Sequence, residues 1–73
     1  MSEYYNPNSI VDQLKKRGVD SSFENRRYIY HANYTCMVPE YKGTAEQNVQ
    51  MLRDLKKGKL NYWFVSYIKI NYI

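Results

Sequence analysis

The sequence has few of the residues with which very small proteins form covalent or metal cross-links. Its 73 residues include one cysteine, Cys36, and one histidine, His31. A single cysteine cannot form an internal disulfide or build a cysteine-based zinc site, and no histidine-based zinc pattern is present. The fold must therefore rely on a small hydrophobic core, since a chain of this length buries only about 60% of its unfolded surface.

Targeting signals and long apolar runs are also missing. Residues 1–9 are polar and lack the basic and apolar regions of a secretory signal. The longest uncharged, largely apolar stretch, residues 60–68, is too short to cross a bilayer. We expect a soluble chain that is made in the cytoplasm and has no membrane span.

Residues suited to catalysis are scarce. His31 and Cys36 are the only candidate base and thiol, and at five residues apart they point in different directions on a helix or a strand. Asp12, Asp20 and Glu24 are explained by helix starts and a turn. The sequence has no glycine-rich phosphate loop and no nucleophile elbow. We predict a non-enzyme without a metal or another cofactor.

Tyrosine and positive charge, in contrast, are abundant. Nine Tyr, two Phe and one Trp make up 16% of the chain, and 11 Lys and Arg outnumber 7 Asp and Glu, for a net charge of +4. Aromatic faces stack on sugar rings or bases, and cations pair with phosphates. This composition suits nucleic acid, polysaccharide or another wall polymer.

Two helices are indicated by their termini. Ser9 with Asp12, and Thr44 with Gln47, have the spacing of capping boxes, and a basic turn followed by glycine ends each segment. These signals predict helices at about residues 10–17 and 45–57. The second would bury an apolar stripe, which consists of Ala45, Val49, Leu52 and Leu55.

The segment between these helices has two interpretations. Ser21 and Glu24 also have capping-box spacing, which favours a helix to about Ala32. A period-two pattern over residues 27–38 fits a strand instead. We prefer the helix and predict a mainly α fold, a small three-helix domain with an extended or strand-like C-terminal tail. The alternative is an α+β fold with strands near residues 27–38 and 60–72.

The chain accordingly divides into an extended leader at residues 1–8, a three-helix module at 9–58 and a tail at 59–73. The tail is rich in aromatic and β-branched residues, as strands are, and an uncovered apolar strand edge promotes aggregation. It would be covered by residues 28–38, if these form a strand, or by the same tail in a second copy. Homo-oligomerisation through the tail is therefore one expectation.

Three strings carry a resemblance to a known family. NPNSIVD spans residues 6–12, GVDSSF spans 18–23 and is followed by Asn25 and Arg26, and YKGTAEQN spans 41–48. Together they resemble the small C-terminal module of Gram-positive phage endolysins and prophage N-acetylmuramoyl-L-alanine amidases. The resemblance covers about residues 6–57. Gln13 replaces the aromatic residue usual in the pattern, and the tail has no counterpart in it.

The resemblance implies a non-catalytic module or subunit that binds peptidoglycan or a wall glycan, associated with a lytic catalytic subunit and acting at the bacterial cell wall. Short polar side chains beside an aromatic ring can bond the acetamido and peptide groups of such a ligand. The residues that would do so are Asp20, Ser21, Asn25, Arg26, Tyr41, Gln47 and Asn48. Several of them also fit structural roles in caps and turns.

A second hypothesis is a small basic phage-type regulator that binds nucleic acid or another protein. Its cations and tyrosines suit nucleic acid, whereas the absence of a contiguous Lys/Arg-rich helix face counts against it. Salt-sensitive retention on DNA or RNA would distinguish this hypothesis from wall binding.

Overall fold

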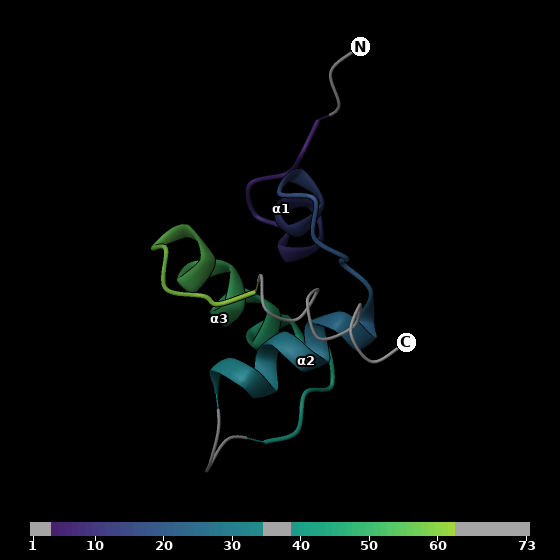
Figure 1. The fold of residues 1–73 in the computed structure, drawn as a ribbon, viewed down its shortest axis with the longest axis vertical. Helices are drawn as coiled ribbons and strands as arrows, with labels where there is room; N and C mark the ends of the chain where they lie inside the picture. Colours follow the sequence, from purple (N-terminus) through teal and green to yellow (C-terminus); the bar gives the residue numbers. More distant parts are fainter. Residues whose placement is uncertain (1–3, 35–38, 63–73) are drawn as a thin grey trace.

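The structure, a computed structural model, describes residues 4–34 and 39–62 and contains three α-helices (Figure 1). They are α1 (Ile10–Lys16), α2 (Phe23–Asn33) and α3 (Ala45–Lys56). No strand occurs in these two ranges, so the predicted mainly α three-helix fold is confirmed. The alternative strand near residues 27–38 is wrong for residues 27–33, while 35–38 and 63–73 lie outside the described residues.

Helix α1 begins at its predicted cap. The Ser9 hydroxyl accepts a hydrogen bond from the Asp12 amide at 3.2 Å. Asp12 does not complete the box, because its carboxylate accepts from the amide of Asn6, at 2.9 Å, rather than from that of Ser9. The Ser9 amide donates instead to the Asn6 carbonyl at 3.1 Å. The aspartate thus fastens the preceding turn to the helix N-terminus, where its negative charge is also favourable.

The N-cap of α2 lies one residue later than predicted. Ser22, and not Ser21, is the N-cap, and its hydroxyl accepts from the Asn25 amide at 3.2 Å. The predicted box of Ser21 and Glu24 is therefore wrong. Adjacent serines offer two registers, and Asp20 selects the second by accepting from the Ser22 amide at 2.9 Å.

Helix α3 has the complete capping box that its sequence predicts. Thr44 Oγ1 accepts from the Gln47 amide at 3.2 Å, and Gln47 Oε1 accepts from the Thr44 amide at 3.3 Å. The same Gln47 oxygen accepts from the Lys42 amide at 2.8 Å. One buried side chain therefore fixes both the start of α3 and the loop that leads into it.

Helices α1 and α3 end in the same way. At Gly18 φ is 72°, and at Gly58 it is 71°, a left-handed conformation that favours glycine. After α1 the amides of Gly18 and Val19 donate to the carbonyls of Lys15 and Leu14, which is a Schellman motif. The amides of Gly58 and Lys59 make the corresponding pair of bonds at the end of α3.

The core lies between the helices. α1 packs against α3, and Ile29 and Tyr30 of α2 join the same cluster. Its buried members are Ile10, Leu14, Val19, Ile29, Tyr30, Tyr41, Met51, Leu52, Leu55 and Leu60. None of the helices in the described part of the chain is long and apolar enough to span a membrane.

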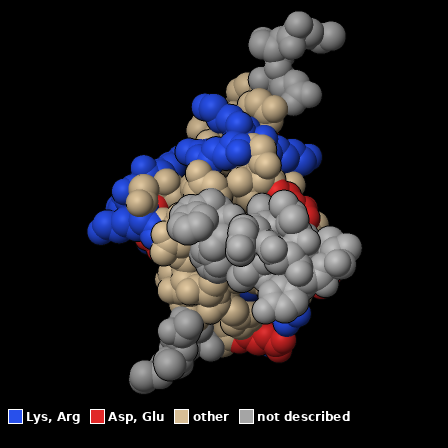
Figure 2. Space-filling view, viewed as in Figure 1, with Lys and Arg blue, Asp and Glu red and all other residues tan. Residues whose placement is uncertain are grey.

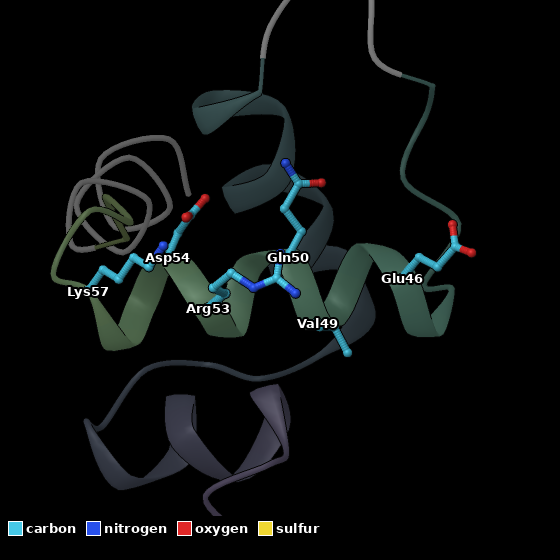
Figure 3. A pocket seen from close by; sticks show the side chains of 6 residues that line it. All are labelled: Glu46, Val49, Gln50, Arg53, Asp54 and Lys57. Atoms are coloured by element: carbon cyan, nitrogen blue, oxygen red, sulfur yellow. The ribbon is translucent and has the colours of Figure 1, made fainter.

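The predicted apolar stripe of α3 is only partly correct. Leu52 and Leu55 are buried, as expected, but Val49 is 46% exposed and Ala45 is exposed as well. The buried face is centred on Met51 and Leu55, and at 3.6 residues per turn Val49 lies about 140° away from that centre. Val49 instead lies on the outer, largely polar face of the helix (Figure 3).

Contacts at the end of α2 add the first tail residues to the core. The Asn33 side chain donates to the Asn61 carbonyl at 2.8 Å and accepts from the Asn61 amide at 2.9 Å. This pairing places Leu60 in the core with 6% of its surface exposed. The packed unit therefore extends beyond residue 58, the end of the three-helix module expected from the sequence.

The two serines before α2 provide a test of its start. Replacement of Ser22 with alanine (Ser22→Ala) removes the N-cap bond and should lower the free energy of unfolding by about 1 kcal/mol. Ser21→Ala retains the backbone carbonyl through which Ser21 bonds Arg26 and should have a smaller effect. Urea denaturation followed by circular dichroism measures both. Equal losses, or a larger loss for Ser21→Ala, would contradict the assignment.

Tyr34 provides a test at high pH. Burial, followed by its 2.5 Å hydrogen bond to Asp54, raises the pKa of the Tyr34 phenol well above its usual value. The neutral phenol therefore stabilises the fold below pH about 10, where an unfolded tyrosine ionises, and this contribution is lost as the pH rises further. The stability advantage of wild type over Tyr34→Phe should shrink between pH 8 and about 11 in urea titrations.

The matched control for this measurement is Tyr28→Phe, because Tyr28 is 46% exposed and its hydroxyl has no hydrogen bond within the described residues. This variant measures what the loss of an exposed tyrosine hydroxyl does over the same range. A Tyr34→Phe difference that does not shrink relative to this control would contradict the prediction.

Candidate functional site

The seven residues singled out in the sequence lie at the start of α2, at the start of α3 and in the loop before α3. Contacts connect six of them directly, and the seventh, Gln47, holds the loop that carries Tyr41. Residues up to 28 positions apart in sequence are thereby brought to one region of the molecule, on the side of α2 and α3 where both helices begin.

Arg26 is the centre of this region. Its Nε donates to the Ser21 carbonyl at 3.1 Å. Its Nη1 donates to the Tyr41 hydroxyl at 3.1 Å and to Asn48 Oδ1 at 3.3 Å. The Tyr41 hydroxyl also donates to the same Asn48 oxygen, which closes a three-membered network. The described residues provide no partner for Nη2, so the guanidinium retains donor capacity.

Tyr41 is a core residue, with 2% of its surface exposed. Its ring packs against those of Phe23 and Tyr30, each with a centroid distance of 5.3 Å. Burial raises the pKa of its phenol, and the nearby Arg26 guanidinium partly opposes that shift. The ring is therefore part of the core, and neither of its faces is accessible for stacking on a ligand.

Asn25 and Gln47 are also buried, with 0% and 8% of their surfaces exposed. The Asn25 amide nitrogen donates to the Asp20 carbonyl at 2.6 Å, and that of Gln47 donates to the Glu40 carbonyl at 3.0 Å. Each side chain therefore fixes one loop at the site. Asn25 Oδ1 has no hydrogen-bond partner among the described residues, although such buried oxygens are normally paired.

The accessible part of the region consists of four of the seven residues. Asp20 is exposed, while Ser21, Arg26 and Asn48 are partly exposed. The sequence analysis assigned no binding role to Phe23, yet this residue is 48% exposed and its ring lies beside that of Tyr41. The sequence contained a clue to the position of Phe23, because in the string GVDSSF it directly follows Ser22, the N-cap of α2. An exposed ring near a guanidinium whose Nη2 has no partner among residues 4–34 and 39–62 suits a sugar that carries an acetamido group.

A hollow of about 500 Å³ lies away from this region, on the outer face of α3 (Figure 3). Side chains of both charges line it, Glu46 and Asp54 together with Arg53 and Lys57. All of them belong to α3 or to its C-cap, Lys57, and they share one side of it, as on any solvated helix face. With two charges of each sign it favours neither anions nor cations.

Positive charge gathers on another part of the surface. Figure 2 shows Lys and Arg side chains in a band over α1 and the end of α3, the upper part of the view. The exposed cations at these two helix ends are Lys15, Lys16, Arg17, Lys56, Lys57 and Lys59. No single helix presents a continuous basic face, but two adjoining helix ends together do.

In the described ranges, no group of three or more His, Cys, Asp and Glu side chains is placed to hold a metal ion.

Searches with models of protein families, among curated proteins and among solved structures found no match to the chain.

Proposed function

We propose that the chain is a non-catalytic module that binds peptidoglycan and works with a phage or prophage lytic enzyme. The observation that carries the proposal is the network around Arg26, which joins residues of two separate motifs, Ser21 of the first and Tyr41 and Asn48 of the second. Both motifs are those on which the resemblance to endolysin modules rests.

The chemistry of the accessible groups suits a wall glycan. Phe23 offers a half-exposed ring to the apolar face of a sugar. Next to it, the Arg26 guanidinium can donate to an acetamido or peptide carbonyl, while Asp20 offers carboxylate oxygens to hydroxyl or amide donors. A site that combines one ring with donors and acceptors is typical of carbohydrate recognition and needs no reactive group.

The buried residues support this function indirectly. Asn25, Tyr41 and Gln47 fix the loops and hold Arg26 in position, so the ordering of these groups is already achieved before a ligand binds. Such preorganisation lowers the entropic cost of association. We assign these three residues to positioning, and assign ligand contact to Asp20, Ser21, Arg26 and Asn48 together with Phe23.

The proposal is tested by co-sedimentation with Gram-positive sacculi, both intact and stripped of teichoic acid. Wild type should pellet with both preparations. A Phe23→Ala, Arg26→Gln double variant should lose about tenfold or more in affinity, since it lacks the exposed ring and the charged donor. Tyr41→Ala is unsuitable because it would remove a core side chain.

The matched control for this experiment is Val49→Ala, Arg53→Gln, which removes an exposed apolar and a cationic side chain from the outer face of α3. It should pellet as wild type does, and circular dichroism checks that both variants fold. Folded wild-type protein that remains in the supernatant with both preparations would contradict the proposal.

The basic band favours a second candidate function, binding of nucleic acid. Six exposed cations on adjoining helix ends provide the shared face that the sequence did not reveal. Retention on DNA or RNA would then fall steeply with salt, by roughly 0.7–0.9 in log affinity per log salt for each phosphate contacted. Lys16→Gln, Lys57→Gln should weaken that retention, whereas Phe23→Ala, Arg26→Gln should not. Sacculus binding with no retention on nucleic acid at low salt would exclude this candidate.

A further inference from the structure

The outer face of α2 carries a group of hydrogen-bond donors that the proposed glycan site does not use. Arg27, Tyr28, His31 and Ala32 line a shallow hollow of about 390 Å³. They stand at positions i, i+1, i+4 and i+5 of the helix and therefore share one face. Arg26, the centre of the glycan site, is not among the lining residues.

The hydrogen bond of His31 fixes which ring nitrogen carries its proton. The Tyr41 amide donates to His31 Nε2 at 3.1 Å, so Nε2 must present a lone pair. The neutral ring then has its proton on Nδ1, which becomes a donor. An edge-on contact with Tyr30, with centroids 5.6 Å apart, further restricts the orientation of the ring. Nδ1 has no partner within the described residues.

Arg27 is a second donor to which the described part of the chain offers no acceptor. Its guanidinium lies 5.6 Å from the centroid of the Tyr28 ring, and this is its only polar contact within the described ranges. Glu24, one turn earlier on α2, makes no ion pair with it. The Tyr28 hydroxyl provides a third donor, while the Tyr28 ring and the Ala32 methyl group provide apolar walls.

We propose that Arg27, Tyr28 and His31 bind an oxyanion, a carboxylate or phosphate group with a small apolar neighbour. The side chains that line the hollow include a guanidinium, an imidazole N–H and a phenol, which can all donate to such a group, and charge-assisted bonds of this kind are the stronger ones. This inference rests on the proposed wall-binding function only for the source of the anion. The anion would be either the terminal carboxylate of a peptidoglycan stem peptide or a phosphodiester of teichoic acid.

The single histidine of the chain makes this site directly observable. In protein with ¹⁵N-labelled histidine at pH 8, imidazole spectra of free wild type should show the Nδ1-protonated tautomer. N-acetyl-D-alanyl-D-alanine and glycerol phosphate are then titrated separately. A saturable shift of the Nδ1 signal with the first identifies a stem-peptide carboxylate, and one with the second identifies a teichoic-acid phosphate.

The variant Arg27→Gln should weaken the response by about tenfold or more, because the charged donor is lost. Arg53→Gln, which removes an equal charge from the outer face of α3, should respond as wild type does. Absence of a saturable shift with both probes overturns the inference, as does an unchanged response in Arg27→Gln. An Nε2-protonated ring in the free protein would also overturn it.

Sacculus co-sedimentation separates this inference from the proposed function. If Phe23→Ala, Arg26→Gln loses binding while Arg27→Gln retains it and His31 shows no shift, wall binding stands and the oxyanion site is refuted. If wild type fails to pellet but His31 still responds to a probe, the oxyanion site stands and peptidoglycan binding is refuted.

Discussion

The buried Tyr41 is the residue on which the arrangement of the helices most depends. Its ring packs between Phe23 and Tyr30 of α2, and its hydroxyl reaches Asn48 of α3 and Arg26 of α2. Its backbone amide bonds His31. One residue of an irregular loop therefore fixes the distance between α2 and α3 and holds the side chain at the centre of the proposed glycan site. This dependence gives a chain without disulfides a defined surface despite its small core.

The capping signals in the sequence predicted a helix boundary well where they allowed a single position for it. The box of Thr44 and Gln47 and the glycine after α3 each had a single possible register, and the helix boundaries agree to one residue. The two adjacent serines before α2 allowed two positions for the N-cap, because the choice between Ser21 and Ser22 depends on the Asp20 side chain. The apolar stripe of α3 was misjudged at Val49, since burial depends on where α1 and α2 pack and not on hydropathy alone.

The residues that the motifs select lie in one region of the structure, but the motifs do not indicate which of them are buried. That they form a binding site stays a prediction. Asn25, Tyr41 and Gln47 look in sequence like ligand-binding residues, but all three are buried. The amide nitrogen of Asn25 and the side chain of Gln47 bond nearby backbone groups, and the Tyr41 hydroxyl bonds Arg26. The exposure of Phe23 and the tautomer of His31 could not be predicted from the sequence, because both are set by tertiary contacts.

The glycines after α1 and α3 adopt backbone conformations that bear on the chirality of the residue at each position. Gly18 and Gly58 have φ values that suit a residue of the opposite chirality, and no neighbouring atom lies within 4 Å of a Cβ built there with the natural hand. Steric crowding by the rest of the molecule therefore does not explain why these positions hold glycine; the intrinsic preference of L-residues does. The φ values at both points are those that a D-residue prefers, and replacing glycine with D-alanine would also restrict the unfolded chain.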